Sequence, residues 1–338
     1  LLDGFLGRNA IVAKAKHLHE QQLQREAYEN RKVQPLVSLE EARADRQFTD
    51  VNSVVAPRIK TPQTFIDVDI ARVEPYINWS MLFNEWGLAG HYPEILSDPI
   101  KGAEAQRLYD DAQNLLQTIK ADHLLKLQAV VGIFDAYRDG DDICLIDKAG
   151  NEHILPTLRN QTAGVAHRCL ADYVATENDY LCCFALTAGI GLKDLFEYYK
   201  SENDDYMAFM AKFLTDRVTE AFAEYIHLYV RRNMWGFEKD ITSDIEHYEG
   251  SRLAFGYPAT PDHNLKRQVF ELLGVEEKTE MRLMESNMIV PEEAECGLIF
   301  RNAKPFAIGK IDEEQLKDYA RRSQMTIEEA KVMLVKNL

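Results

Sequence analysis

The sequence predicts a single α+β domain: a twisted antiparallel sheet flanked by long helices, preceded by a helical linker. Three observations predict this class. Short apolar runs are joined by a tight turn, as in a hairpin. Longer segments keep their apolar residues at helical spacing. Strands and helices do not alternate as the βαβ units of a parallel sheet would. The chain has 338 residues, 46% of them apolar, which is enough to bury a full core.

The N-terminal third predicts a linker, a strap and a helix, in that order. Residues 9–31 are typical of a polar amphipathic connecting helix. The following forty residues contain Pro35, Pro57 and Pro62, which favours an extended strap with little regular structure. From Ile100 we expect a helix that packs against the sheet. Its predicted apolar face is Ala103, Leu108, Ala112, Leu115, Leu116 and Ile119.

The remaining elements follow from short apolar runs and turn residues. Residues 130–134 and 142–146 predict an antiparallel hairpin, because Asp139-Gly140 between them is typical of a tight turn. Residues 204–234 keep helical spacing throughout and predict a long helix. The other predicted elements are a strand at 180–186, a loop-rich stretch at 236–262, a short helix at 263–273, strands at 297–301 and 306–309, and a closing pair of helices from Asp312.

Composition excludes several classes of function. The 39 Lys and Arg against 55 Asp and Glu give a formal net charge of −16, which would repel a nucleic-acid backbone, and the densest basic clusters are only Arg231-Arg232 and Arg321-Arg322. The longest apolar run, 180–192, is shorter than the roughly 18 residues of a membrane span. We therefore expect no nucleic-acid partner and no membrane segment.

The cysteines and the first residues allow predictions about the cellular compartment and about whether the chain is part of a longer one. The five cysteines, at 144, 169, 182, 183 and 296, match neither a disulfide framework nor a zinc site, which favours the reducing cytoplasm. The start, Leu1-Leu2-Asp3-Gly4, has no initiator Met and no secretory pattern. We expect a piece of a longer chain.

Two polar motifs each have two interpretations. Thr187 to Gly191 follows a strand and precedes a helix, so it suggests a nucleotide-binding loop, but Asp194 stands where the third glycine would be and a tight turn is the alternative. Asp216, Glu220, Glu224 and His227 form one stripe of the long helix. The Glu-x-x-His pair within it is typical of di-iron centres, but such a centre needs a second copy, which the sequence lacks. Two interpretations of the stripe remain: a solvated helix face, or a polar wall that faces a ligand. No serine or cysteine stands in a nucleophile-elbow pattern, so a hydrolase has no support.

Two further segments are unusual. In the first, Arg252 stands four residues before Gly256-Tyr257-Pro258-Ala259, and an arginine beside such a turn can hold a carboxylate through both branches of its guanidinium. The second is Pro75-Tyr76-Ile77-Asn78-Trp79, with Trp86 close behind, where two of the three tryptophans gather. From residue types alone, the first segment can equally be a surface loop, and the aromatic residues of the second can equally be part of the core.

Together, these segments resemble a known family. Arg252-x3-Gly-Tyr-Pro-Ala resembles the signature of the C-terminal activation domain of cobalamin-dependent methionine synthase. Other similar segments follow in the same order: 75–79, 88–93, 102–108, 169–173, 204–206, 216–217, 220–225 and 318–320. The resemblance implies an S-adenosylmethionine-binding activation domain at 35–338. It also implies that residues 1–34 are the tail of the preceding cobalamin-binding domain and its linker helix.

The resemblance implies a function and a site. In this family the domain binds S-adenosylmethionine and uses it, with one electron from flavodoxin or a flavoprotein reductase, to remethylate cobalamin that has reached the inactive Co(II) state. Methionine synthase itself makes methionine from homocysteine. By this resemblance, Arg252 holds the ligand carboxylate and the backbone of Gly256, Pro258 and Ala259 lines the groove. Tyr257 lies beside the reacting methyl group and is the expected catalytic residue. The surrounding wall is Glu220, Glu246 and His263.

Two positions depart from the family pattern. Asn78 stands where many members have Asp, so its side-chain oxygen accepts a hydrogen bond without charge assistance. Pro305-Phe306 stands where some members have Tyr-Tyr, so contacts there are apolar or made by a carbonyl group. The resemblance places both sites in the ligand groove.

Two other functions stay open at this point. A free-standing S-adenosylmethionine-dependent methyltransferase would need its own acceptor pocket and usually a complete glycine-rich loop, which Gly189-x-Gly191 does not supply. A non-catalytic binding or docking module would not need a buried arginine beside Gly-Tyr-Pro. A ligand-binding titration separates the docking module from the others.

Overall fold

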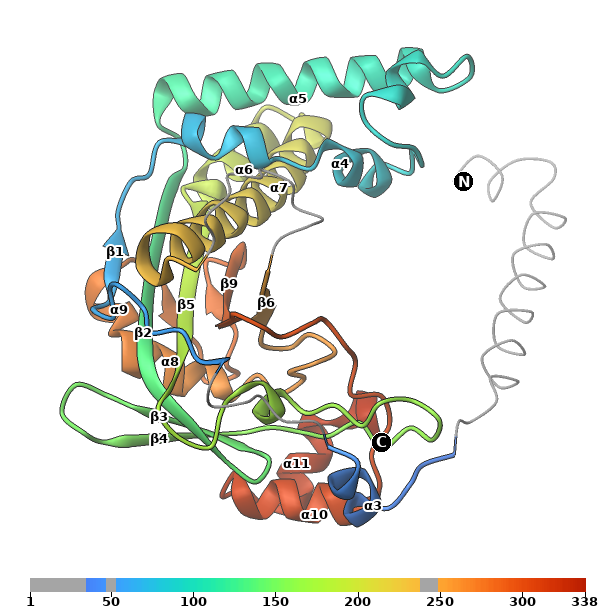
Figure 1. The fold of residues 1–338 in the computed structure, drawn as a ribbon. Helices are drawn as coiled ribbons and strands as arrows, with labels where there is room; N and C mark the ends of the chain where they lie inside the picture. Colours follow the sequence, from blue (N-terminus) through green and yellow to red (C-terminus); the bar gives the residue numbers. More distant parts are fainter. Residues whose placement is uncertain (1–34, 47–52, 238–248) are drawn as a thin grey trace, which may run out of the picture.

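The central feature of the fold is an antiparallel sheet (Figure 1). The structure, a computed structural model, describes residues 35–46, 53–237 and 249–338. Within them, strands pair in the order β4-β3-β2-β5-β9-β6, with β1 on β2, and every pair is antiparallel. The strands are β1 (Gln63–Phe65), β2 (Lys126–Asp139), β3 (Asp142–Ile146), β4 (Glu152–Pro156), β5 (Asp179–Ile190), β6 (Ser251–Ala254) and β9 (Ala294–Phe300). The predicted α+β class is confirmed.

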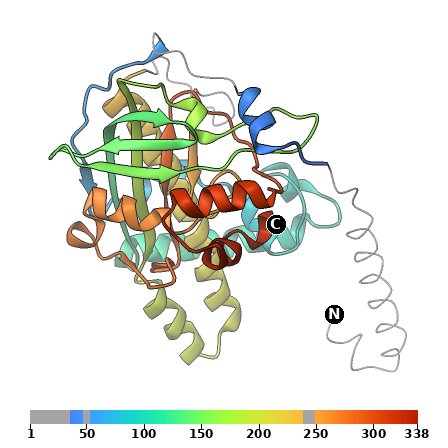
Figure 2. The same cartoon turned by 90° about the horizontal axis from the view of Figure 1, so that it is seen from below.

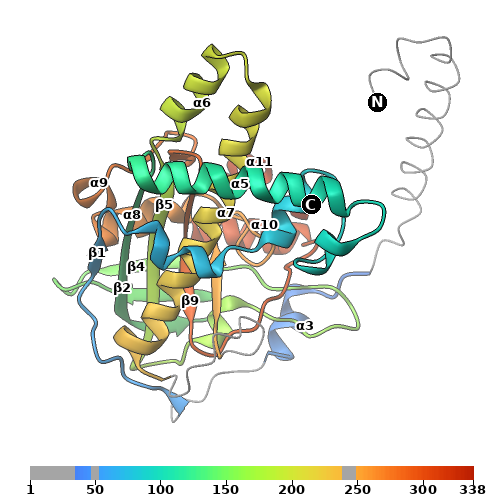
Figure 3. The same cartoon turned by 90° about the horizontal axis from the view of Figure 1, so that it is seen from above.

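Long helices cover one face of the sheet. Here Leu214, Val218 and Phe222 of α7 pack in one apolar core with Phe184 of β5. Figure 3 shows α5 crossing α7, while α6 and the start of α7 project from the body. The helices are α4 (Trp79–Glu85), α5 (Gly102–Asp122), α6 (Leu192–Ser201) and α7 (Asp205–Tyr229), which continues as a π-helix at Val230–Trp235. The predicted helices from Ile100 and at 204–234 are therefore present, but α5 packs on α7 rather than on the sheet, and Ala103 of its predicted apolar face is exposed.

Shorter elements cover the opposite face. Val269 and Phe270 of α8 pack with Leu298 of β9 in a second core. The elements are α8 (Leu265–Leu273), α9 (Val275–Lys278) and the small hairpin β7 (Arg282–Leu283) and β8 (Ile289–Val290). A third core lies under α10 (Glu313–Arg322) and α11 (Ile327–Met333). Figure 2 shows these two helices from below. The short helix and the closing pair of helices match the prediction.

Two predicted turns are present. Asp139 pairs with Asp142 across the β2–β3 turn, where Gly140 takes a φ of +59°. Gly191, at a φ of +99°, is the turn between β5 and α6, but residues 187–190, expected in that turn, continue β5. A Cβ on Gly189 would lie 2.9 Å from a carboxylate oxygen of Glu293. This glycine therefore packs against an acid, which is unsuited to a phosphate.

Other predictions need correction or cannot be compared. Residues 236–262 were expected to be loop, yet Ser251–Ala254 forms β6 on β9. The strand predicted at 306–309 is wrong, because the Ile308 amide donates to Pro258 O of a turn and Ala307 O accepts from the Asn160 side chain, with no strand alongside. The strap is largely irregular, as predicted, apart from α3 (Leu39–Ala44) and β1. The helix expected at 9–31 lies outside the described residues.

Short 3-10 helices complete the described chain: Ile70–Arg72, Glu74–Tyr76, Glu94–Ser97, Leu170–Tyr173 and Val335–Asn337. No helix in the described part of the chain combines the length and apolar character that crossing a bilayer requires. All five cysteines are buried free thiols.

Candidate functional site

The Gly-Tyr-Pro segment forms a tight turn directly after β6. Gly256 N donates to Thr260 O at 2.7 Å, and the Thr260 hydroxyl donates to Ala254 O at 2.6 Å. Gly256 takes a φ of +94°, and a Cβ there would lie 2.1 Å from Cε1 of His263. Only glycine allows this backbone to lie against the imidazole. The turn is thus fixed by its own hydrogen bonds and by close packing.

Arg252 lies between two carboxylates at the base of this turn. Its Nη2 is 2.9 Å from Oε1 of Glu224 on α7, and its Nη1 contacts Oε2 of Glu295 on β9. The three side chains are only 16%, 18% and 13% exposed. Burial raises the pKa of Glu295; Arg252 opposes this shift and the neighbouring Glu220 adds to it. We call these three residues the Arg252 triad.

A second arginine on α7 is held in the same way. Arg217 lies 2.8 Å from Glu220 and 3.0 Å from Glu85 of α4. Burial raises the pKa of Asp216, one turn before Glu220. Along α7, Glu220 thus pairs with Arg217 of the same helix, and Glu224 pairs with Arg252 of β6.

This arrangement decides between the interpretations of the α7 stripe. His227 is fully buried, and burial lowers its pKa well below the ordinary value, so the interpretation of a wholly solvated stripe is wrong. Glu220 and Glu224 are partly buried and ion-paired, which suits a polar wall. Among the described residues, no three His, Cys, Asp or Glu side chains gather as a metal site would require.

Tyr257 extends from the turn into solvent. It is 58% exposed. Partial burial raises its pKa, and the carboxylates of Glu295 and Glu220 raise it further, so the phenol stays neutral at neutral pH. It can donate a hydrogen bond, but it cannot act as an anionic base.

Residues 305–308 lie beside this turn. Pro258 O accepts from Ile308 N at 2.9 Å, and Ala259 is buried beneath. Pro305 is exposed, whereas the Phe306 ring lies 6.3 Å from the ring of Tyr173. The Pro305-Phe306 segment thus borders the turn and directs an aromatic ring toward the core.

The other predicted site residues have different surroundings. Nδ1 of His263 is buried and has no hydrogen-bond partner in the described part of the chain, and burial, followed by the charge of Lys266, lowers the pKa of the ring. Asn78 is exposed and caps α4, accepting from Met81 N at 3.4 Å. The structure shows no contact between Asn78 and the Arg252 triad. Glu246 lies outside the described residues.

Comparison with known proteins assigns the family. The family model described as vitamin B12 dependent methionine synthase, activation domain, matches residues 69–324. The chain belongs to this family. It is also similar to a solved structure described as the MetH reactivation domain bound to AdoHcy, with 38% sequence identity and a TM-score of 0.85 over 90% of this chain and 99% of that one.

Sequence reasoning missed three charged residues of this activation domain. Glu295 lies two residues before the strand predicted at 297–301, and the alternation Glu295-x-Gly297-x-Ile299 places it on the face of β9 toward α7. Arg217 stands three residues before Glu220, a spacing that pairs side chains on a helix. No sequence pattern indicated Glu85, because its ion pair with Arg217 forms only when the folded chain brings α4 to α7.

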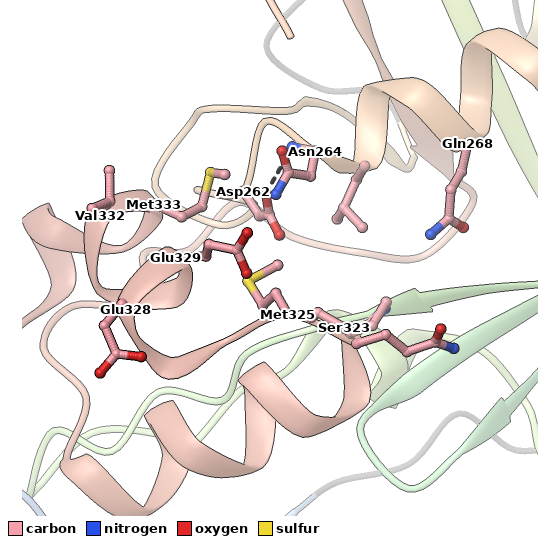
Figure 4. A pocket seen from close by; sticks show the side chains of 12 residues that line it. Asp262, Asn264, Gln268, Ser323, Met325, Glu328, Glu329, Val332 and Met333 are labelled. Carbon is pink, nitrogen blue, oxygen red and sulfur yellow. Dashed lines mark hydrogen bonds between the residues drawn. The ribbon is translucent and has the colours of Figure 1, made fainter. Parts of the chain in front are cut away.

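A separate cavity of the activation domain has a different character. It encloses about 600 Å³ beside the start of α8 and under α11, on the opposite side of the sheet from the Arg252 triad (Figure 4). Asp262, Glu328 and Glu329 contribute carboxylates, and its lining contains no Lys, Arg or His. For the carboxylate of an amino acid it offers neutral donors such as Asn264 and Ser323 but no cation, and its own acids would repel that carboxylate. The Arg252 triad is the better candidate site.

Proposed function

We propose that this activation domain binds S-adenosylmethionine beside Arg252 and supplies its methyl group for reductive remethylation of cob(II)alamin in methionine synthase. One observation carries the proposal: a largely buried guanidinium lies directly before the Gly256-Tyr257 turn, in a chain of this family. A guanidinium fork matches a carboxylate in shape and charge.

The residues around the turn fit such a ligand. Glu220 and Glu224 place negative charge where an ammonium or sulfonium group would be favoured. Gly256 lets the backbone approach a ligand closely, and the unpartnered Nδ1 of His263 offers a polar atom nearby. Tyr257, exposed and neutral, would border the methyl group. Asn78, Glu246, Pro305 and Phe306 complete the proposed groove.

The role of these residues is binding and orientation. When bound, S-adenosylmethionine would supply an electrophilic methyl group, and a reduced cobalamin the cobalt that accepts it. Arg252 fixes one end of the ligand, and the rigid turn sets where its other end lies, so the methyl group can face a second domain.

Family membership supports a proposal for the partners. We propose that residues 1–34 are the tail of the cobalamin-binding domain and its linker helix, that residues 35–338 are the activation domain, and that both belong to one cytoplasmic polypeptide. Flavodoxin or a flavoprotein reductase is the proposed electron donor.

A methyl-transfer assay tests this function. The chain is incubated with labelled S-adenosylmethionine and no corrin, with cob(II)alamin alone, and with cob(II)alamin plus a one-electron reductant. Transfer is expected only in the last sample. Rapid methylation of another acceptor without corrin would favour a free-standing methyltransferase, and binding without any transfer would favour a non-catalytic module.

Calorimetry tests the assignment of Arg252. Arg252→Ala should weaken S-adenosylmethionine binding by about 1.5 to 3 kcal/mol, because one charge-assisted partner is lost. Arg107→Ala, which removes an exposed arginine of α5, is the matched control and should leave affinity unchanged. Equal affinity of a folded Arg252→Ala variant and the wild-type chain would contradict the assignment.

A further inference from the structure

Arg252 is already occupied in the ligand-free chain. Glu224 contacts one terminal nitrogen and Glu295 the other. A ligand carboxylate can use both branches of the guanidinium only if one of these two side chains gives way. Binding through Arg252 therefore requires an exchange of partners within the Arg252 triad.

The two carboxylates face different surroundings. Ala254 of β6 pairs with Gly297 of β9, and Phe255 N donates to Cys296 O at 2.9 Å, so the same antiparallel register brings Glu295 opposite Gly256. Glu295 therefore lies toward the Gly256-Tyr257 turn. Glu224 belongs to α7 instead, in the second-last turn of that helix. The carboxylate nearer the proposed ligand is Glu295.

Glu295 is also the more deeply buried of the two carboxylates. It is the least exposed member of the triad, at 13%. Burial raises its pKa, and Glu220 and Glu224 both add to this shift, so only Arg252 supports the ionised form. If a ligand carboxylate took Arg252, Glu295 would need another cation. An ammonium group on the same ligand would supply it.

We propose that the Arg252 triad exchanges charges with the amino-acid end of the ligand: the ligand carboxylate replaces Glu295 on Arg252, and Glu295 accepts the ligand ammonium group. This rests on the proposed function, since it takes S-adenosylmethionine or AdoHcy as the ligand. Glu295 thereby becomes a specificity-determining residue. With a ligand that has a carboxylate but no ammonium group, Glu295 competes for Arg252. With a ligand that has both groups, Glu295 binds the ammonium group.

The charges balance in this exchange. Arg252 with two glutamates carries a net charge of −1, and an α-amino acid end is a zwitterion with no net charge. Before binding, the triad contains two ion pairs that share one arginine. Afterwards three ion pairs are possible, with Glu224 and the ligand carboxylate on Arg252 and the ammonium on Glu295. No carboxylate is left buried without a cation, which would be costly.

The test compares two ligands on two variants by calorimetry. The ligands are AdoHcy and its analogue in which hydrogen replaces the amino group. Glu295→Gln keeps the shape of the side chain and removes its charge. It should bind AdoHcy about 10 to 100 times more weakly, the loss expected for one charge-assisted hydrogen bond. The same variant should bind the amino-free analogue at least as tightly as the wild-type chain does, because the competitor is gone.

Matched controls make the result decisive. Glu292→Gln removes a neighbouring exposed acid, which pairs with Lys212 at 3.7 Å, and should change neither affinity. Glu224→Gln should leave the preference for the amino group in place. A loss of that preference in Glu224→Gln, but not in Glu295→Gln, would overturn the proposal. Equal weakening of both ligands by Glu295→Gln, or no change in either, would overturn it too.

Two outcomes separate this proposal from the proposed function. A wild-type chain that binds neither AdoHcy nor S-adenosylmethionine would refute the function, and the exchange with it. A wild-type chain that binds AdoHcy while Glu295→Gln keeps the same ligand preference refutes the exchange alone. If Glu295→Gln does not fold, a structure of the wild-type chain with AdoHcy decides: Glu295 still on Arg252 contradicts the exchange, and Glu295 on the ammonium supports it.

Discussion

At the scale of single residues, Asn78 has a structural role that explains why the position tolerates a neutral side chain. Its oxygen caps the N-terminus of α4 by accepting from Met81 N. Aspartate caps a helix about as well as asparagine, whereas alanine does not cap. The residue therefore serves the helix whether or not it touches a ligand.

We predict that Asn78→Asp leaves the fold intact and binds S-adenosylmethionine equally or more tightly, by less than about 2 kcal/mol, because a charge is added beside a cationic ligand. Asn78→Ala should lower the free energy of unfolding by about 0.5 to 2 kcal/mol through loss of the cap. Denaturant titration and calorimetry measure the two effects. A large loss of affinity in Asn78→Asp would mean that the site depends on a neutral side chain.

The residue scale also shows what the sequence could predict of the site. Arg252 was found because it stands at a fixed distance before an unusual turn. Glu295 was not, since a glutamate two residues before a predicted strand looks like any solvated acid. Its importance arises from the antiparallel pairing of β6 with β9, which brings it to Arg252. Local residue spacing does not predict contacts between strands that are distant in the sequence.

At the scale of elements, the turn that follows β6 depends on one glycine. Gly256 needs both a positive φ and the absence of a Cβ, because His263 occupies that space. Gly140, in the β2–β3 turn, needs only the positive φ, since nothing lies within 4 Å of a Cβ there. The two glycines thus separate the conformational cost of a substitution from the steric cost.

We predict that Gly140→Ala lowers the free energy of unfolding by about 1 kcal/mol, the cost of a left-handed alanine, and leaves ligand affinity unchanged. Gly256→Ala should cost clearly more and should also weaken AdoHcy binding, because the turn or His263 must move. Thermal unfolding and calorimetry on both variants measure this difference. Equal destabilisation of both variants with unchanged affinity would show that the packing of Gly256 on His263 is unimportant.

Elements differ in how well local sequence predicts them. The helices from Ile100 and at 204–234 were predicted because their apolar residues repeat over several turns, and that period survives in the folded chain. β6 was missed because four residues beside Gly-Tyr-Pro carry too little periodicity. The strand expected at 306–309 failed for the opposite reason. Its apolar pattern is real, but its backbone bonds go to a turn and a side chain rather than to a strand.

At the scale of the whole molecule, partly buried ion pairs join the two ends of the described chain. Arg43 of α3 lies 2.6 Å from both Asp141 and Asp318, and Arg322 lies 2.9 Å from Asp318 on α10. Arg159, fully buried, also pairs with Asp141. Figure 1 shows α3 and α10 side by side at this point. The network fixes α10 to the β2–β3 hairpin, which belongs to the main sheet.

This network should make the molecule sensitive to acid. Burial alone would raise the pKa of Asp318, but Arg321, Arg322 and Arg43 outweigh it and lower that pKa to about 2. The unfolded value is higher, near 3.8. A carboxylate whose pKa is depressed in the folded state stabilises the fold at pH values above the unfolded pKa. That stability is lost as pH falls through the folded pKa.

We predict that Asp318→Asn lowers the free energy of unfolding by about 1 to 2 kcal/mol at pH 7, after allowance for solvent screening. At pH 2.5 the difference from the wild-type chain should fall to about a third, because the unfolded chain then also binds the proton. Asp135→Asn, which breaks the exposed pair with Lys60 at 2.9 Å, is the control and should cost less than about 1 kcal/mol. Denaturant titrations at both pH values measure this, and an Asp318→Asn effect of equal size at pH 7 and pH 2.5 would show that its ionised form does not hold α10 in place.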